Sequence, residues 1–323
     1  MRLTFNITGL LLALGLAIAS GGALGQSYPI KGIKLVLGYP PSGGTDTLAR
    51  IVAQKLTERF AQPVIVENRP GANAIIGVDY VAKAAPDGYT LLVASSGEIV
   101  FNPGLYAKLP YDPVKDIFPI MQLSSNPQIF AVHPSVPATT IKELIALAKE
   151  KPGKLFYASG ATAFQVATEL FKKQAGVDIA LIPYKGTGQA ITAVLAGDVA
   201  MATVNIGAVL PYVRAGRLRA IAVSGSKRTA VMPEVPTMGE SGQPNFEVSP
   251  MTGLFAPSKT PKAITDKLYS EVSGILKLPD VLDRFSTLGV EPGGLALAEF
   301  GAQIKSDIEK WAKVSREANI RAE

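Results

Sequence analysis

The chain contains no cysteine, and it has a single histidine and a single tryptophan among its 323 residues. Without cysteine it can form no disulfide and can carry no lipid anchor on an N-terminal cysteine. With one histidine and no cysteine, a single chain cannot assemble a His/Cys zinc site. Its stability must therefore come from a hydrophobic core.

Charged residues and long apolar runs are also scarce. Charged residues make up 18% of the chain and hydrophobic residues 47%, which is typical of a globular protein long enough for two domains. One uncharged apolar run, Leu10 to Ala19, follows Arg2 and precedes the small residues Ala23-Leu24-Gly25. This order predicts an export signal at residues 1–25, cleaved before Gln26, and a periplasmic mature protein. No later stretch is apolar for long enough to predict a membrane span.

The net charge of the predicted mature chain is small. Loss of residues 1–25 leaves 31 basic against 26 acidic residues. Such a charge could attract an anionic solute. We find no basic stretch interleaved with aromatic residues, so a nucleic-acid partner is not expected.

Signatures of catalysis and of cofactors are missing. The chain has neither a P-loop nor a G-x-G-x-x-G motif, and a Ser-His-Asp triad would have to use His133, which precedes Pro134, without any G-x-S-x-G motif. We interpret His133 as a structural residue at a strand end. Lys185 fits a carboxylate partner better than a Schiff-base role. No catalytic residue, metal or cofactor is therefore predicted.

A turn rich in proline and glycine, Gly38 to Gly44, follows the apolar run Leu35–Leu37, and a helical pattern starts after Thr45 or Asp46. The glycines permit a close backbone approach, and Thr and Asp are preferred helix N-caps. Free N–H groups at a helix start favour an anion. Two interpretations remain at this point: an ordinary strand-to-helix connection, or a site for a carboxylate or phosphate.

Strand and helix patterns alternate along the chain, which predicts an α/β fold with largely parallel sheets. A second strand, Leu155–Ser159, runs into Gly160-Ala161-Thr162 and a helix, about 115 residues after the first such unit. After a strand at 252–256 we expect two helices. The last should pack on the first lobe through Phe300, Ile304, Ile308, Trp311 and Val314. Two α/β halves with two chain crossings suggest hinged lobes around a cleft.

Several motifs resemble those of a known family. The chain resembles, in order and over essentially its whole mature length, the periplasmic solute-binding proteins of tripartite tricarboxylate transporters, also called Bug receptors. The segments that carry the resemblance are Tyr39–Asp46, Val66–Ala72, Ala84–Thr90, Asn102–Tyr106, Leu109–Asp116, Ile182–Gly186, Val235–Thr237 and the helix around Trp311.

The resemblance implies a two-lobed, Venus-flytrap α/β protein with a hinge and an interlobe cleft. Lobe 1 would comprise residues 26–128 and 252–323, and lobe 2 residues 129–251. Such a receptor closes on a small organic acid and delivers it to the large and small membrane subunits of the transporter; we expect a monomer. Two alternatives stay open: a sensory accessory protein of a membrane kinase, and an exported α/β hydrolase or lyase that uses His133.

The resemblance also implies which residues meet the ligand carboxylates, at strand-to-helix turns of both lobes. In the first lobe these would be Tyr39, Ser42, Gly43, Gly44, Thr45, Asp46, Ser96 and Gly97. In the second they would be Ser159, Gly160, Ala161, Thr162, Gln165, Tyr184, Lys185 and Asn205. We expect Asp46 to cap the helix or hold water, because its charge would repel a carboxylate.

The sequence departs from the family pattern in the second lobe. Its glycine turn is about two residues shorter than the common form, and Gln165 stands where many members have histidine. Val204-Asn205 replaces the Asp-Asn of many members. Loss of that acid favours a plain carboxylate or an aromatic acid over a ligand with an amino group.

Overall fold

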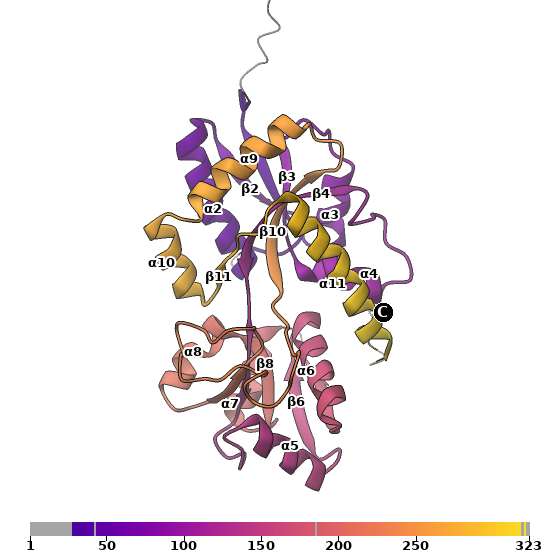
Figure 1. The fold of residues 1–323 in the computed structure, drawn as a ribbon, viewed down its shortest axis with the longest axis vertical. Coiled ribbons are helices and arrows are strands. Elements are labelled where there is room, and N and C mark those ends of the chain that lie inside the picture. Colours follow the sequence, from indigo (N-terminus) through magenta and orange to yellow (C-terminus); the bar gives the residue numbers. More distant parts are fainter. Residues whose placement is uncertain (1–27, 42, 185, 318–319, 321–323) are drawn as a thin grey trace, which may run out of the picture.

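The computed structural model describes residues 28–41, 43–184, 186–317 and 320. The predicted signal peptide, Ser42 and Lys185 lie outside the described residues. Two α/β lobes stand one above the other, and the elements of the first lobe come from both ends of the chain (Figure 1).

The first lobe contains a six-stranded sheet in the order β11-β4-β10-β3-β1-β2. Its strands are β1 (Ile33–Leu37), β2 (Val64–Asn68), β3 (Thr90–Ser95), β4 (Ile117–Ser125), β10 (Met251–Pro257) and β11 (Glu291–Pro292). Its helices are α2 (Gly44–Phe60), α3 (Ile75–Ala82), α4 (Asn102–Leu105), α9 (Lys262–Ile275), α10 (Pro279–Leu288) and α11 (Leu297–Glu317), with a short π-helical segment η1 (Gly97–Phe101) before α4. The apolar stripe of α2, which includes Leu48, Val52 and Leu56, is buried against this sheet and α9.

The second lobe contains a five-stranded sheet in the order β7-β6-β8-β5-β9. Its strands are β5 (Gln128–Val132), β6 (Leu155–Ser159), β7 (Ile179–Pro183), β8 (Met201–Asn205) and β9 (Arg219–Val223). Its helices are α5 (Ile141–Glu150), α6 (Thr162–Ala175), α7 (Thr187–Ala196) and α8 (Ile206–Arg214). The Thr140 side chain caps α5 by accepting the Glu143 N–H, as a capping threonine before an apolar run predicts.

Both sheets are mixed, so the prediction of largely parallel sheets is wrong. β1 is parallel to β2 and β3, and β6 is parallel to β7 and β8. By contrast, β10 and β5 run antiparallel to both of their neighbours. These two strands follow the crossings from the other lobe. Each therefore enters its sheet from the side facing the other lobe, where the parallel strands have their carboxyl ends. It then runs in the opposite direction to those strands.

Two features of the first lobe differ from the sequence prediction. Strand β4 was not predicted. It contains Pro119, which argues against a strand, but the register with β10 shifts between Leu254 and Phe255, where Phe255 pairs with Pro119. The C-terminal part holds three helices, α9, α10 and α11, where two were expected. α9 and α10 are separated by only a few residues, and Pro279 is the first residue of α10, a position that proline favours. In the sequence such a short break is easily taken for one continuous helix.

The two chain crossings lie side by side and are hydrogen-bonded to one another. The Asn126 N–H donates to the Pro250 carbonyl at 2.7 Å, and Asn126 Nδ2 donates to the Thr252 hydroxyl oxygen at 3.2 Å. β5 begins at Gln128 and β10 at Met251, each one residue before a predicted lobe boundary. The boundaries themselves, and a hinge motion at these crossings, stay predictions.

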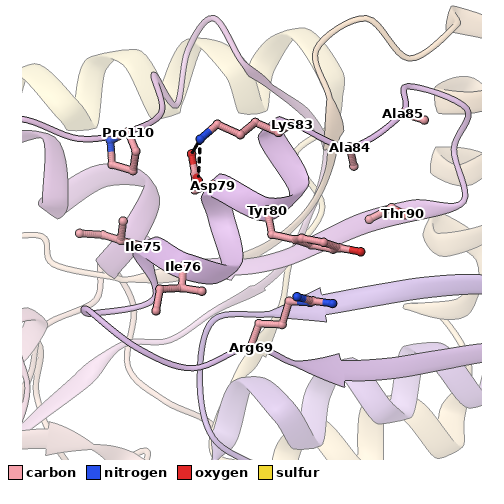
Figure 2. Close-up of a pocket in the computed structure, with 10 residues that line it drawn as sticks. All are labelled: Arg69, Ile75, Ile76, Asp79, Tyr80, Lys83, Ala84, Ala85, Thr90 and Pro110. Carbon is pink, nitrogen blue, oxygen red and sulfur yellow. Dashed lines mark hydrogen bonds and ion pairs between the residues drawn. The ribbon is translucent and has the colours of Figure 1, made fainter.

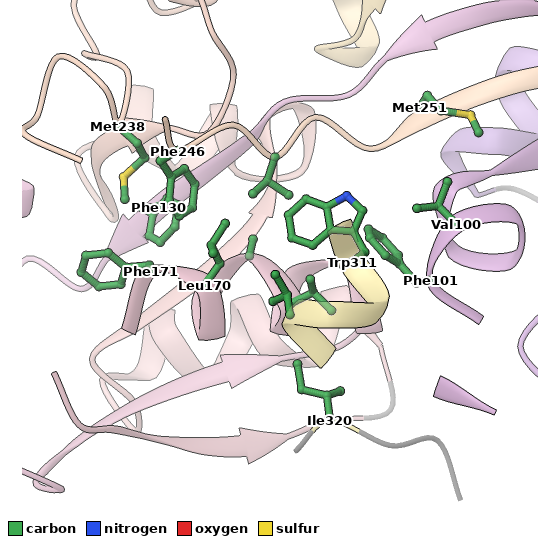
Figure 3. Close-up of a cluster of buried hydrophobic side chains, with 14 of the residues drawn as sticks. Val100, Phe101, Phe130, Leu170, Phe171, Met238, Phe246, Met251, Trp311 and Ile320 are labelled. Carbon is green, nitrogen blue, oxygen red and sulfur yellow. The ribbon is translucent and has the colours of Figure 1, made fainter. Parts of the chain in front are cut away.

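The C-terminal helix α11 packs on the first lobe, as its apolar stripe predicts, and it also reaches the second. It contacts η1, α4 and β4, and it contacts α6. The Trp311 ring meets the Phe101 ring edge-on, with centroids 5.6 Å apart. Figure 3 shows Trp311 with Phe101 on one side and Leu170 of α6 on the other. One buried cluster thus holds side chains of both lobes.

Candidate functional site: the cleft between the lobes

A cleft of about 710 Å³ lies between the lobes and takes its walls from both of them. The first lobe contributes the loop after β1, the end of β3 and the start of η1. The second contributes the starts of α6 and α7 and the end of β8. The predicted site residues that line it are Tyr39, Gly43, Gly44, Thr45, Asp46, Gly97, Gly160, Ala161, Thr162 and Asn205.

Helices of both lobes begin at this cleft, among them α2 after Gly43, α6 after Ala161, α7 after Gly186 and α8 after Asn205. None of these N-cap residues makes a side-chain capping hydrogen bond. The first N–H groups of a helix have no partner inside it, and they carry the positive end of the helix dipole. The cleft therefore presents donors from both lobes to an anion.

Glycine has a different role on each side of the cleft. A Cβ atom at Gly160 would lie 2.2 Å from the carbonyl carbon of Gly186, so glycine is required for the α6 and α7 starts to approach each other. A Cβ atom at Gly44 would meet nothing within 4 Å. The start of α2 is thus open toward a guest.

Asp46 lies in the first turn of α2, whose N-cap is Gly43, so of the two expected roles the N-cap is wrong and the holding of water stays a prediction. Its side chain is 3% exposed and paired: Arg50 Nε donates to Oδ2 at 2.8 Å, and Asn68 Nδ2 donates to Oδ1 at 2.9 Å. Arg50 stands one turn further along α2, within reach of the carboxylate. Because Asn68 also donates to the Tyr39 carbonyl at 3.0 Å, Asp46 helps to hold the turn before the helix.

Four predicted site residues do not line the cleft. Ser96 is buried behind it and accepts the Met251 N–H at 2.8 Å, while the Ser159 hydroxyl donates to the Ala161 carbonyl at 3.0 Å. Both serines hold main-chain groups next to the cleft in place and do not face the cleft themselves. Tyr184 packs against the apolar cluster of the second lobe, and Gln165 lies within α6 beyond the cleft lining.

Sequence reasoning missed polar residues that the crossings and neighbouring turns bring to the cleft. They are Asn73, Ser95, Asn102, Asn126, Gln128, Thr187 and Thr252. Gln128 is fully buried; its Nε2 donates to the Ala163 carbonyl at 3.3 Å, and its Oε1 has no hydrogen-bond partner within the described part of the chain. Asn102 could have been found from its place in the Asn102–Tyr106 motif. Ser95 and Asn73 are neighbours of predicted segments, whereas the residues of the crossings, Asn126, Gln128 and Thr252, carry no local signal.

A buried acid, Glu98, lies directly behind the cleft wall. The Tyr39 hydroxyl donates to Glu98 Oε2 at 2.8 Å, and the Ser95 N–H donates to Oε1 at 2.8 Å. Burial raises the pKa of the Glu98 carboxyl, and the hydrogen bonds from Ser95 and Tyr39 oppose this in part. Burial also raises the pKa of the Tyr39 hydroxyl, so this hydroxyl keeps its proton at neutral pH.

A second hollow, of about 660 Å³, lies on the first lobe beside α3 (Figure 2). Its charged side chains are paired or stacked: Lys83 meets Asp79 at 2.7 Å, and the Arg69 guanidinium lies 3.7 Å from the centroid of the Tyr80 ring. No helix of the described chain begins among its lining residues except α3 at Ile75. It lacks the convergent donors of the interlobe cleft.

His133 does not line the cleft; its Nδ1 lies 2.7 Å from the Ser135 hydroxyl oxygen. Among the described residues, no three His, Cys, Asp or Glu side chains gather closely enough to hold a metal ion. Within the same residues no helix combines the length and the apolar character needed to span a bilayer.

Two α/β lobes joined by paired crossings, with helix starts of both lobes facing one cleft, define a periplasmic-binding-protein fold. The chain belongs to the tripartite tricarboxylate transporter family receptors, whose family model matches residues 48–320. The family resemblance of the motifs is thereby confirmed.

Relatives and solved structures agree with this family. The chain is 36% identical to protein BugT of Bordetella pertussis over 323 residues, covering 98% of this chain and 99% of that protein. It superposes on R. palustris Rpa4515 with adipate with a TM-score of 0.81 and 32% identity, covering 91% of this chain and 99% of that one. The match to MatC (Rpa3494) from Rhodopseudomonas palustris with bound malate has a TM-score of 0.76 and 31% identity, covering 89% and 99%.

Proposed function

We propose that this receptor captures a small organic acid in the interlobe cleft and delivers it to the large and small membrane subunits of a tripartite transporter. The observation that carries the proposal is the convergence of helix starts without side-chain caps, from two lobes, on one cleft. The chemistry of such a cleft favours an anion such as a carboxylate.

The solved relatives support the same ligand class. Rpa4515 was solved with adipate and MatC with malate, and both ligands are dicarboxylic acids. A charge-assisted hydrogen bond contributes about 1.5–3 kcal/mol. Two carboxylates, each held by a few backbone N–H groups, can thus give a dissociation constant on the order of micromolar.

In this proposal the ligand meets Gly43, Gly44 and Thr45 in the first lobe and Ala161 and Thr162 in the second. Tyr39, Gly97, Gly160 and Asn205 line the same cleft and shape the pocket. Ser42, as a first-lobe contact, and Lys185, as a residue of the second-lobe site, lie outside the described residues and stay predictions.

The finer parts of the proposal concern export, assembly and chemistry. The protein is exported by the signal at residues 1–25, acts as a monomer and turns over no substrate. Neither alternative, a sensory accessory protein or a hydrolase, finds support in the comparisons with known proteins. The position of His133 away from the cleft lining also disfavours a hydrolase that would use it.

A thermal-shift screen of the chain from Gln26 onward tests the proposal. A ligand that binds only the folded state raises the melting temperature, by the equivalent of about 2.7 kcal/mol at 100 times its dissociation constant. The panel contains adipate, malate, succinate, citrate, benzoate, aspartate and glutamate, with adipamide as the uncharged control. We expect stabilisation by at least one plain carboxylate and none by adipamide.

Two outcomes would count against the proposal. No stabilisation by any acid in the panel would remove carboxylate capture. Tight binding of aspartate or glutamate, with no binding of plain carboxylates, would overturn the inference drawn from Val204-Asn205.

A further inference from the structure

Glu98 is a buried carboxyl group without a charged partner. Its side chain is 0% exposed, in the first turn of η1. Within the described part of the chain it forms no ion pair. Its side-chain oxygens bond instead to the Ser95 N–H and to two hydroxyl groups, those of Tyr39 at 2.8 Å and Ser95 at 2.7 Å.

Those two hydroxyl groups separate Glu98 from the cleft. Tyr39 and Ser95 line the cleft, and both donate to the same oxygen, Oε2. While Glu98 is ionised it can only accept, so both hydroxyl hydrogens are directed away from a guest. Its negative charge also opposes the entry of an anion.

Among the described residues, the elements packed around η1 offer no charge that would neutralise Glu98. η1 is packed by β3, α4, α6 and α11, and β3 and α4 contain no acid or base. The Tyr111 hydroxyl donates to the main-chain carbonyl of Glu98 at 2.6 Å and not to its side-chain carboxyl group. On α6, Lys172 pairs with Glu169 at 2.8 Å, and Lys173 pairs with Glu317 of α11. Asp307 of α11 is partly buried, and the remaining charged side chains of that helix are exposed.

We propose that Glu98 takes up a proton from solvent when the cleft captures a carboxylate, and that this frees a hydroxyl hydrogen of Tyr39 or Ser95 for the ligand. The protonated carboxyl group donates to one of the two hydroxyl oxygens, and that hydroxyl then donates into the cleft. No other bond is made or broken. Glu98 is thus a positioning residue that acts through Tyr39 and Ser95, and the inference rests on the proposed carboxylate capture.

The direction of the pH dependence follows from burial. In the free protein burial raises the pKa of Glu98 above its ordinary value of 4.5, and a bound anion raises it further. Proton uptake on binding is therefore largest between these two pKa values. Affinity is highest below the pKa of the free protein, and it falls by up to about tenfold per pH unit above it, until the pKa of the complex is passed.

Isothermal titration calorimetry tests this proposal with the acid from the panel that binds most tightly. Titrations at about pH 5 to about pH 8, in buffer pairs with different ionisation heats and corrected for the ionisation of the free acid itself, give the affinity and the number of protons taken up. We expect wild type to take up as much as about one proton and to bind more weakly as pH rises. Glu98→Gln should lose that uptake and bind at high pH as wild type does at low pH, because the amide NH₂ can donate to either hydroxyl oxygen.

Asp307→Asn is the matched control. Asp307 is a second acid whose pKa is raised by burial, and it lies on α11 outside the cleft lining. This variant should keep the proton uptake of wild type. Tyr39→Phe, which removes one of the two donors, should weaken binding at about pH 5 more than at about pH 8.

The possible failures are distinguishable. Binding by wild type without proton uptake at any of these pH values overturns the inference and leaves carboxylate capture intact, and this holds even if Glu98→Gln does not fold. The same follows if Glu98→Gln retains the proton uptake. If no acid in the panel binds wild type, both the proposed function and this inference fall.

Discussion

Gly44 and Gly160 line the same cleft but differ in what surrounds them, and this difference separates binding from folding. Because a Cβ atom at Gly44 would meet nothing within 4 Å, we expect Gly44→Val to fold normally. Its side chain would obstruct the N–H groups at the start of α2. Loss of one charge-assisted hydrogen bond of about 1.5–3 kcal/mol weakens binding at least about tenfold. Calorimetry with the acid that binds wild type measures this.

Gly160→Ala is the paired variant in the second lobe. Its new methyl group would lie 2.2 Å from a main-chain carbon of Gly186, so the starts of α6 and α7 must separate. We expect a loss of about 1–3 kcal/mol in the free energy of unfolding, together with weaker binding. Urea denaturation measures the first. If Gly44→Val bound ligand as wild type does, the start of α2 would not belong to the site.

At the scale of elements, α11 is one apolar link between the lobes outside the crossings, beside the contacts of η1 with α6 and of α10 with α8. Trp311 is 5% exposed and stacks edge-on with Phe101. Trp311→Ala should reduce the free energy of unfolding by about 3–5 kcal/mol, because it leaves a cavity in a cluster shared by both lobes. Urea denaturation followed by circular dichroism measures the change.

Lys173→Ala is the control for the same helix contact. Lys173 pairs with Glu317 across the lobes, but both side chains are substantially exposed, and exposed ion pairs contribute little. This variant should unfold at nearly the urea concentration of wild type. A small effect of Trp311→Ala would show that the Trp311 contact of α11 contributes little to holding the lobes together.

At the scale of the whole molecule, the proposed function requires the lobes to approach each other on binding. The absence of cysteine allows a clean spin-label pair, Lys151→Cys in the second lobe and Lys277→Cys in the first. Both lysines are exposed, and neither lines the cleft. We expect electron–electron resonance to show a shorter and narrower distance distribution with a saturating acid. Identical distributions with and without the acid would contradict closure.

Much of the local structure follows from the sequence. The strand at 155–159 has the predicted bounds, and the glycine turns precede helices as expected. These features depend on neighbours within a few residues: apolar spacing, β-branched runs, and glycine where the backbone turns. The cysteine count and the motif order also suffice to exclude disulfides and to identify the family.

Only the tertiary structure determined which residues share the cleft. Asn126, Gln128 and Thr252 come from the crossings, and the Ser96–Met251 bond joins residues 155 positions apart. It also showed that Asp46 is paired with Arg50 and that Glu98 lies buried behind Tyr39. Burial and long-range contact depend on how the two sheets are placed. No local pattern encodes that placement, so the carboxylate-binding turns are visible in the sequence while their surroundings are not.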